Sequence, residues 1–420
     1  MKIKMKKASW EEILAKPAIP HLKPLAPPFL FRLLVRVLSI PDLWKVKFSY
    51  TKEGMERSGE GPYLILMNHS SFLDLKMASK VLFPMPYNIV STTDTFVGKA
   101  LLMRLVGCIP TQKFVTDVNL VMDMIRIIKK QKRSILMYPE AGYTFDGTAT
   151  TLPRKLGGMC KRLGVPVLML RSDEGGFLRD PLYNGLRLRR VKVSATLSCL
   201  FSREELKELS VEELDARIDE AFSFDHFAAQ KEKGVAVTEK TRAAGLERVL
   251  YRCPHCEGDG VMKGEGEKLF CTACGKEYKL LTDGSLQATE GKTAFSHVPS
   301  WYAWERACVK KELEEGTYRL EVPVKVGVIC DHRAMYMVGE GTLIHDRGGF
   351  TLKRENGEVV YTQDPYASYG LNADFFFYEI GDMISIGDKK RLYYCFPQVP
   401  VPVTRARLAA EEMYHMPKIL

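Results

Sequence analysis

His69 and Asp74 combine residue types and a spacing that can do acid–base chemistry. They begin and end the segment His-Ser-Ser-Phe-Leu-Asp, which follows the apolar run 63–67. An aspartate on the first helical turn after such a strand can reach one ring nitrogen of the histidine, fixing its tautomer and stabilising the imidazolium. Glu140 follows a second apolar run, 135–138. Ligands in open α/β sheets bind at the carboxyl ends of strands, so we predict a general-base site there.

Two Cys-x-x-Cys pairs form a second candidate site. Fourteen residues separate the pairs, as is typical of a four-cysteine zinc ribbon, and the members are Cys253, Cys256, Cys271 and Cys274. Four thiolates close a tetrahedral shell and leave no position for a substrate, so we predict a structural zinc. Two disulfides are the alternative. The other cysteines lie scattered in apolar surroundings, which favours a reducing compartment.

The pattern around His69 predicts an α/β scaffold. Short apolar runs alternate with helical spacing between about 62 and 235. The expected strands are 63–67, 87–90, 135–138, 165–170 and 191–197, and the expected helices are 72–83, 117–131 and 153–163. Two capping boxes, Ser202 with Glu205 and Ser210 with Glu213, open the helices that close the domain. We expect residues 51–235 to form an α/β domain with a mixed, largely buried sheet.

In this order, the motifs resemble those of the glycerophospholipid acyltransferase superfamily, the lysophosphatidate-acyltransferase-like enzymes. The family blocks are Asn-His-x4-Asp, a Gly with a basic residue some six positions on, Phe-Pro-Glu-Gly-Thr-Arg, and a Val-Pro-rich strand. The matching positions are Asn68, His69 and Asp74, then Gly107 and Lys113, then Tyr-Pro-Glu-Ala-Gly-Tyr at 138–143, and finally Val-Pro-Val at 165–167. The resemblance covers about residues 25 to 235.

The resemblance implies an O-acyltransferase of phospholipid biosynthesis. It would move a fatty acyl group from acyl-CoA or acyl carrier protein to a hydroxyl of a lysophospholipid or glycerol-phosphate-like acceptor. His69 and Asp74 would be catalytic, and the hydroxyl would attack the thioester directly, without an acyl-enzyme. Ser70 and Ser71 are then helix-capping residues rather than nucleophiles. Substrate binding is expected at Asn68, Gly107, Lys113, Glu140, Gly142, Arg154 and Lys155.

Two departures from the family pattern bear on the acceptor. Tyr143 stands where the family has an arginine that helps to hold the acceptor phosphate. Lys113 replaces a second arginine, giving a point charge in place of a bidentate fork. Arg154 and Lys155 could supply the missing charge, with a surface role as the alternative.

The segment 29–38 predicts a helix at a membrane surface. It is apolar apart from Arg32 and Arg36, which share one helical stripe and can snorkel toward phosphates. A helix packed on its own domain is the alternative. The chain has no run of about 20 apolar residues, and its net charge of +10 favours polyanionic partners such as anionic lipid. The basic N-terminus lacks the apolar stretch of a signal peptide. We expect residues 1–50 to hold this helix, on a cytoplasmic protein peripherally attached to the membrane.

The rest of the chain predicts three further parts. Residues 245–290 would be the zinc ribbon, and 291–317 a linker helix capped by Ser300. Period-two alternation over 318–420 predicts a β domain that has a final helix at 404–415 and resembles a pleckstrin-homology-like barrel. In addition, 186–190 alternates leucine with arginine, as in a strand with its arginines on one face.

Two other functions fit parts of this sequence. A zinc-ribbon nucleic-acid-binding protein would explain the charge and the cysteines but leaves the first 235 residues unexplained. A catalytically degenerate acyltransferase that serves as a membrane scaffold would explain the altered third block. We expect the acyltransferase, with no nucleic-acid partner.

Overall fold

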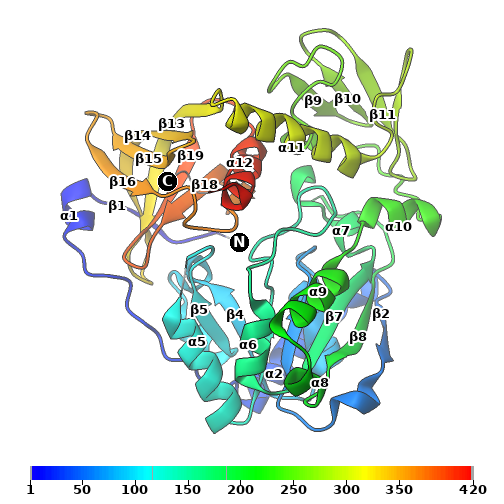
Figure 1. Cartoon of the computed structure of the whole chain (residues 1–420), viewed down its shortest axis with the longest axis vertical. Coiled ribbons are helices and arrows are strands. Elements are labelled where there is room, and N and C mark those ends of the chain that lie inside the picture. Colours follow the sequence, from blue (N-terminus) through cyan, green and yellow to red (C-terminus); the bar gives the residue numbers. More distant parts are fainter. Residues whose placement is uncertain (1, 116, 186, 418–420) are drawn as a thin grey trace.

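Figure 1 shows the computed structural model, which describes residues 2–115, 117–185 and 187–417. The α/β part lies at the bottom, the four-cysteine module at the upper right and the C-terminal β sheet at the upper left. The long helix α11 (Val298–Glu314) and the last helix, α12 (Val403–His415), lie between these parts.

The α/β part contains a seven-stranded sheet in the order β2-β8-β7-β3-β6-β4-β5. The strands are β2 (Ser49–Glu53), β3 (Leu64–Met67), β4 (Tyr87–Thr92), β5 (Cys108–Thr111), β6 (Ser134–Met137), β7 (Val167–Glu174) and β8 (Ser194–Phe201). The strands β3 to β7 run parallel to their neighbours, whereas β8 is antiparallel to β7. All residues of β3 and β6 are buried, as expected for central strands covered on both faces. The predicted mixed, buried sheet is confirmed.

Helices cover both faces of this sheet. The helices of this part are α2 (Phe29–Lys45), α3 (Asp74–Leu82), α4 (Ala100–Leu105), α5 (Val118–Ile125), α6 (Leu156–Leu163), α7 (Gly176–Arg179), α8 (Glu205–Glu208), α9 (Val211–Phe222) and α10 (His226–Glu232). On one face α2 and α3 pack against the strands, and on the other α5, α6 and α9 do so. Short turns of helix are η1 (Met55–Ser58), η2 (Thr93–Phe96), η3 (Arg126–Lys130), η4 (Leu182–Asn184) and η5 (Leu246–Arg248). Both predicted capping boxes form, because each serine exchanges hydrogen bonds with the glutamate three residues on.

The predicted strand at 186–190 is wrong. Leu186 lies outside the described residues, and 187–193 contain no strand, since β8 begins at Ser194. Arg189 is buried and donates to the hydroxyl of Tyr183 (3.0 Å) and to the carbonyl of Arg242 (2.9 Å). In this segment Arg189 is therefore buried against polar acceptors, and the arginines do not line one exposed face of a strand.

The four-cysteine module carries an antiparallel sheet in the order β12-β11-β10-β9. Its strands are β9 (Met262–Glu265), β10 (Lys268–Cys271), β11 (Glu277–Leu280) and β12 (Leu286–Ala288). The following helix, α11, begins earlier than predicted, with His297 as its N-cap. Ser300 therefore lies inside the helix, because Pro299 fits the first turn and starts it upstream.

The C-terminal part is the β-rich region that the alternation predicts. Its strands are β13 (Arg319–Ile329), β14 (Met335–Asp346), β15 (Gly349–Arg354), β16 (Val359–Gln363), β17 (Asn372–Phe377), β18 (Gly381–Gly387) and β19 (Leu392–Pro397). They pair antiparallel in the order β16-β15-β14-β13-β19-β18-β17, and α12 follows. A pleckstrin-homology-like fold stays a prediction.

The N-terminus belongs to this C-terminal part. Strand β1 (Met5–Lys7) pairs in parallel with β14 at Met335–Met337, a stretch that β15 leaves free. Helix α1 (Trp10–Leu14) buries Trp10 and Ile13 in the C-terminal core. The segment predicted as 1–50 is thus divided, since its first residues complete the C-terminal sheet while α2 packs on the α/β part.

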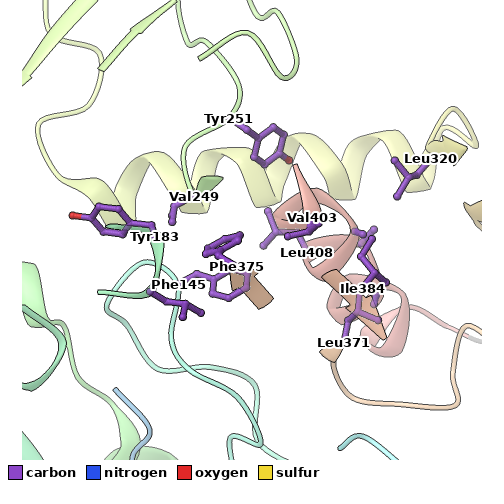
Figure 2. Packing of buried hydrophobic residues seen from close by; sticks show 14 of the residues in the cluster. Phe145, Tyr183, Val249, Tyr251, Leu320, Leu371, Phe375, Ile384, Val403 and Leu408 are labelled. Carbon is purple, nitrogen blue, oxygen red and sulfur yellow. The ribbon is translucent and has the colours of Figure 1, made fainter. Parts of the chain in front are cut away.

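One hydrophobic cluster joins these parts. Figure 2 shows Phe145 of the α/β part beside Phe375 of β17, with Tyr183 on one side of this pair and Leu408 of α12 on the other. The rings of Phe145 and Phe375 stack with centroids 4.4 Å apart. This shared core fixes the C-terminal part against the loop that follows β6.

Candidate active site

His69 and Asp74 meet as their spacing predicts. His69 follows β3, Asp74 is the first residue of α3, and His69 Nδ1 lies 2.8 Å from Asp74 Oδ2. With the ring hydrogen on Nδ1 donated to the carboxylate, Nε2 carries the lone pair that a general base needs. The imidazole is 21% exposed and the aspartate 1%. The pair therefore combines an accessible base with a buried partner.

Asp74 also organises the turn between strand and helix. Its Oδ2 accepts the backbone N–H groups of Ser70 (3.0 Å) and Ser71 (3.2 Å). Burial raises the pKa of Asp74, while the hydrogen bonds from His69 and from these N–H groups act in the opposite direction. Ser71 accepts the N–H of Leu73 and donates to Asp180. The predicted capping role of Ser70 and Ser71 is wrong, because Leu73 is the N-cap of α3 and no described side chain caps this helix.

The loop after β6 holds the backbone of His69 on both sides. Glu140 Oε2 accepts the His69 N–H at 2.7 Å, and the N–H of Thr144 donates to the His69 carbonyl at 3.2 Å. The second oxygen of Glu140 accepts the N–H (3.1 Å) and hydroxyl (3.0 Å) of Thr150. Glu140 is fully buried, and this burial raises its pKa to about 7. In this conformation it positions His69; its predicted contact with substrate stays a prediction.

Aromatic rings enclose the imidazole. Tyr143 stacks on His69 with centroids 3.8 Å apart, and Tyr138 lies at 4.4 Å. Phe72 in turn contacts Tyr143, at 4.9 Å. The tyrosine that replaces the family arginine thus packs on the base itself. A Cβ built on Gly142 would meet nothing within 4 Å, so there is open space beside this loop.

The predicted basic residues have different surroundings in the structure. Desolvation raises the pKa of Asp374 in β17 to about 6, and the positive charge of Lys113 acts in the opposite direction, so this cation already interacts with a carboxylate. The Arg154 guanidinium lies over the Tyr414 ring, at 4.7 Å. Lys155 is exposed at the start of α6. Substrate contacts of these residues stay predictions.

Asn68 and Gly107 have clear roles in the fold. Asn68 Oδ1 accepts the N–H of Ser172 at 2.8 Å, which ties the end of β3 to β7. Gly107 adopts φ +92°, and its carbonyl accepts from Ile89 and from the amide of Asn88. A side chain at this position would press on the Pro27 ring and on the Tyr87 carbonyl. Their predicted part in substrate binding remains untested.

The four paired cysteines gather as a metal site requires. Their sulfurs all lie within 4.8 Å of one another, with Cys253 and Cys274 at 3.8 Å and Cys256 and Cys271 at 3.7 Å. A tetrahedron with Zn–S bonds of about 2.3 Å has edges of about 3.8 Å, so the set fits zinc. Disulfides would need sulfurs about 2.05 Å apart, and the four thiols are free.

Comparison with known proteins supports this description of the first domain. Residues 49–168 match the Acyltransferase family model, which supports acyl transfer as the general chemistry of this part of the chain. Among solved structures, the chain is similar to the 1-acyl-sn-glycerophosphate (LPA) acyltransferase PlsC from Thermotoga maritima, with 13% identity and a TM-score of 0.32 over 44% of this chain and 78% of that one. The search of curated proteins gives no match.

Several residues around His69 were not predicted from the sequence. Asp180 accepts a hydrogen bond from Ser71, and Thr150 donates to Glu140; both bonds order the site, but no motif marks these residues. Arg407 of α12 donates to the Tyr143 carbonyl across 264 positions. Only the position of Thr150, close after the third block, offered a local signal.

Proposed function

We propose that this protein is a membrane-surface O-acyltransferase with His69 as its general base. It transfers a fatty acyl group from acyl-CoA or acyl carrier protein to a hydroxyl of a lysophospholipid or glycerol-phosphate-like acceptor. The observation that carries the proposal is the 2.8 Å contact between His69 and Asp74 within the stretch that matches the Acyltransferase family model. Its place is phospholipid biosynthesis on the cytoplasmic side, as a peripheral protein.

In the proposed reaction, His69 Nε2 accepts the hydroxyl proton as the acceptor oxygen attacks the thioester carbonyl carbon. The tetrahedral intermediate collapses with loss of the thiolate, which takes the proton from the imidazolium. The products are an ester and a free thiol. Asp74 stabilises the imidazolium between the two proton transfers.

Exposed apolar residues on α2 support attachment to a membrane. Leu30 is 70% exposed, Leu38 66% and Trp44 81%. The helix packs on α3 through Ser39 and Leu43, so its apolar face is left outward. Among the described residues, no helix is long and apolar enough to cross a bilayer.

The test is acyl transfer by purified variants with a panel of thioester donors and lysolipid or glycerol-phosphate acceptors. His69→Ala should lower the rate by roughly 10² to 10⁴, because a hydroxyl needs a positioned base to attack at neutral pH. Asp74→Asn keeps the shape but loses the charge that stabilises the imidazolium, so a large but smaller loss is expected.

His21→Ala is the matched control, since His21 pairs with Asp123 of α5 outside this site. It should keep the wild-type rate. A folded His69→Ala protein with most of the wild-type activity would falsify the mechanism. Wild-type protein that binds lipid but transfers no acyl group would instead indicate a scaffold.

A further inference from the structure

The loop from Pro139 to Thr150, here called the catalytic loop, is supported by residues of the C-terminal part. The hydroxyl of Tyr369 donates to the Pro139 carbonyl at 3.1 Å. The Phe375 ring stacks on Phe145. Arg407 Nη1 donates to the Tyr143 carbonyl at 3.0 Å, and its guanidinium lies over Phe145, 4.3 Å from the ring centroid.

The catalytic loop in turn determines where His69 sits. It binds the N–H of His69 through Glu140 and the carbonyl of His69 through Thr144, and it lays Tyr143 on the imidazole. A shift of the loop would therefore move the ring relative to Asp74, which α3 holds independently. Displacements on the scale of 1 Å are enough to slow a reaction strongly.

Arg407 is itself held in a buried charge network. Its Nε lies 2.9 Å from Glu411, which also accepts from Arg306 of α11 at 2.6 Å. Arg407 and Glu411 are 4% and 3% exposed. Such a network fixes the guanidinium, so the donor to Tyr143 is rigidly aimed. A cavity of about 590 Å³ opens beside the loop, between Thr150 and Arg306. On the side of this cavity, the catalytic loop is supported by the hydrogen bond from Arg407.

We propose that the C-terminal part completes the catalytic site, with Arg407 as the positioning residue that holds the catalytic loop against His69. The expected effect on kcat rests on the proposed acyl-transfer function. The expected effect on the position of the catalytic loop does not. Arg407 does not contact the reacting atoms. It acts through the Tyr143 carbonyl, and the loop then orients the base.

The experiment compares Arg407→Gln, Arg407→Lys and wild type in two measurements. The first is the rate at which diethyl pyrocarbonate modifies His69, followed by mass spectrometry with His21 as the internal reference. The second is the split between kcat and acceptor KM. Arg407→Gln should raise His69 modification about twofold or more by loosening the loop. It should lower kcat roughly ten- to a hundredfold with little change in KM, since orientation rather than affinity is lost. Arg407→Lys keeps a donor and should restore part of both.

Arg405→Gln is the matched control on the same helix. Arg405 forms partly exposed ion pairs with Asp259 and Glu312, and its recorded partners lie outside the catalytic loop. Its loss tests the effect of weakening α12, and both measurements should stay at wild-type values. Equal effects of the two glutamine variants would show a general stability effect and overturn the proposal.

Tyr369→Phe provides a second variant if Arg407→Gln does not fold. It removes one hydroxyl that donates to the loop and should change both measurements in the same direction, by less. If Arg407→Gln folds and its His69 is modified at the wild-type rate, the positioning role is overturned. If only Tyr369→Phe folds, the same result for that variant overturns it. If wild type transfers no acyl group, the proposed function fails while the modification rates still decide the positioning role.

Discussion

The protonation state of the Glu140 side chain affects the position of His69, the proposed base. Its carboxylate accepts from His69, from the backbone of Thr150 and from the Thr150 hydroxyl. Burial opposes the charged form and outweighs these donors, so the pKa rises from 4.5 to about 7. Near neutral pH, the Glu140 carboxyl that binds the His69 N–H therefore changes between its protonated and ionised forms.

This shift predicts a pH dependence of stability. The folded state binds the Glu140 proton more tightly than the unfolded chain does, so the contribution is full below pH 4.5 and is lost as pH rises through about 7. At about 1.4 kcal/mol per pH unit, the wild type should lose up to about 3 kcal/mol relative to Glu140→Gln across that window. Urea unfolding of both proteins between pH 4.5 and 8 measures the difference.

Glu213→Gln is the control for this titration. Glu213 is exposed in a capping box that lowers its pKa, so its contribution is already present above pH 4.5 and lost only below it. Its difference from wild type should be constant over the window. A constant difference for Glu140→Gln as well would contradict the raised pKa.

Helix α2 shows how one element can serve both the fold and a surface. Ser39 and Leu43 face the α/β part, and the hydroxyl of Ser39 accepts from Ser79 of α3 at 3.1 Å. Most of the other apolar side chains are exposed, and Arg32 near one end binds the Pro84 carbonyl. Such a helix is typical of one that lies in the headgroup region.

Replacing Leu30 and Leu38 together by Asp should release the protein from vesicles of phosphatidylcholine and phosphatidylglycerol. Each leucine contributes about 1.5–3 kcal/mol if buried in lipid, so binding should weaken on the order of a hundredfold or more. Vesicle sedimentation measures this. Leu188→Asp is the matched control, because Leu188 is 61% exposed but lies outside α2. Equal binding of both variants would show that α2 is not the contact.

Hydrogen bonds and an ion pair on α11 connect the cysteine module to the C-terminal helix α12. Two side chains of α11 bind the backbone of Arg252, the residue directly before Cys253. Glu305 accepts the Arg252 N–H at 2.7 Å, and the Trp301 indole N–H donates to the Arg252 carbonyl at 3.0 Å. The same helix carries Arg306, which pairs with Glu411 of α12. Order in the four-cysteine cluster therefore extends, through α11, to α12, which supports the catalytic loop.

Metal removal should loosen this connection. Protein purified under reducing conditions should contain about one zinc per chain, and chelation or Cys271→Ser should lower Tm and the near-ultraviolet circular dichroism of Trp301, because metal binding supplies folding energy to so small a module. Elemental analysis and a thermal scan measure both.

Cys308→Ser is the control for metal binding. Cys308 lies on α11 outside the four-sulfur cluster, so zinc content should stay unchanged. Reduced wild-type protein without metal would show that the cluster is not a zinc site.

The sequence by itself determined the features that depend on near neighbours. The contact of His69 with Asp74 follows from five positions at a strand-to-helix turn, and the cysteine cluster follows from two short pairs. Buried runs of four or more apolar residues predicted the central strands, because their side chains must be covered on both faces. Predicted boundaries mostly differ by one to three residues, where local caps rather than periodicity decide.

Only the tertiary structure decided which distant segments share a surface. Strand β1 joins the C-terminal sheet because β14 has a free stretch there, and Arg189 turns inward because Tyr183 and Arg242 supply acceptors. Arg407 reaches Tyr143 across 264 positions for the same kind of reason. Such contacts depend on the shape and polarity of surfaces that exist only after the elements pack. No periodicity or spacing along the chain encodes them.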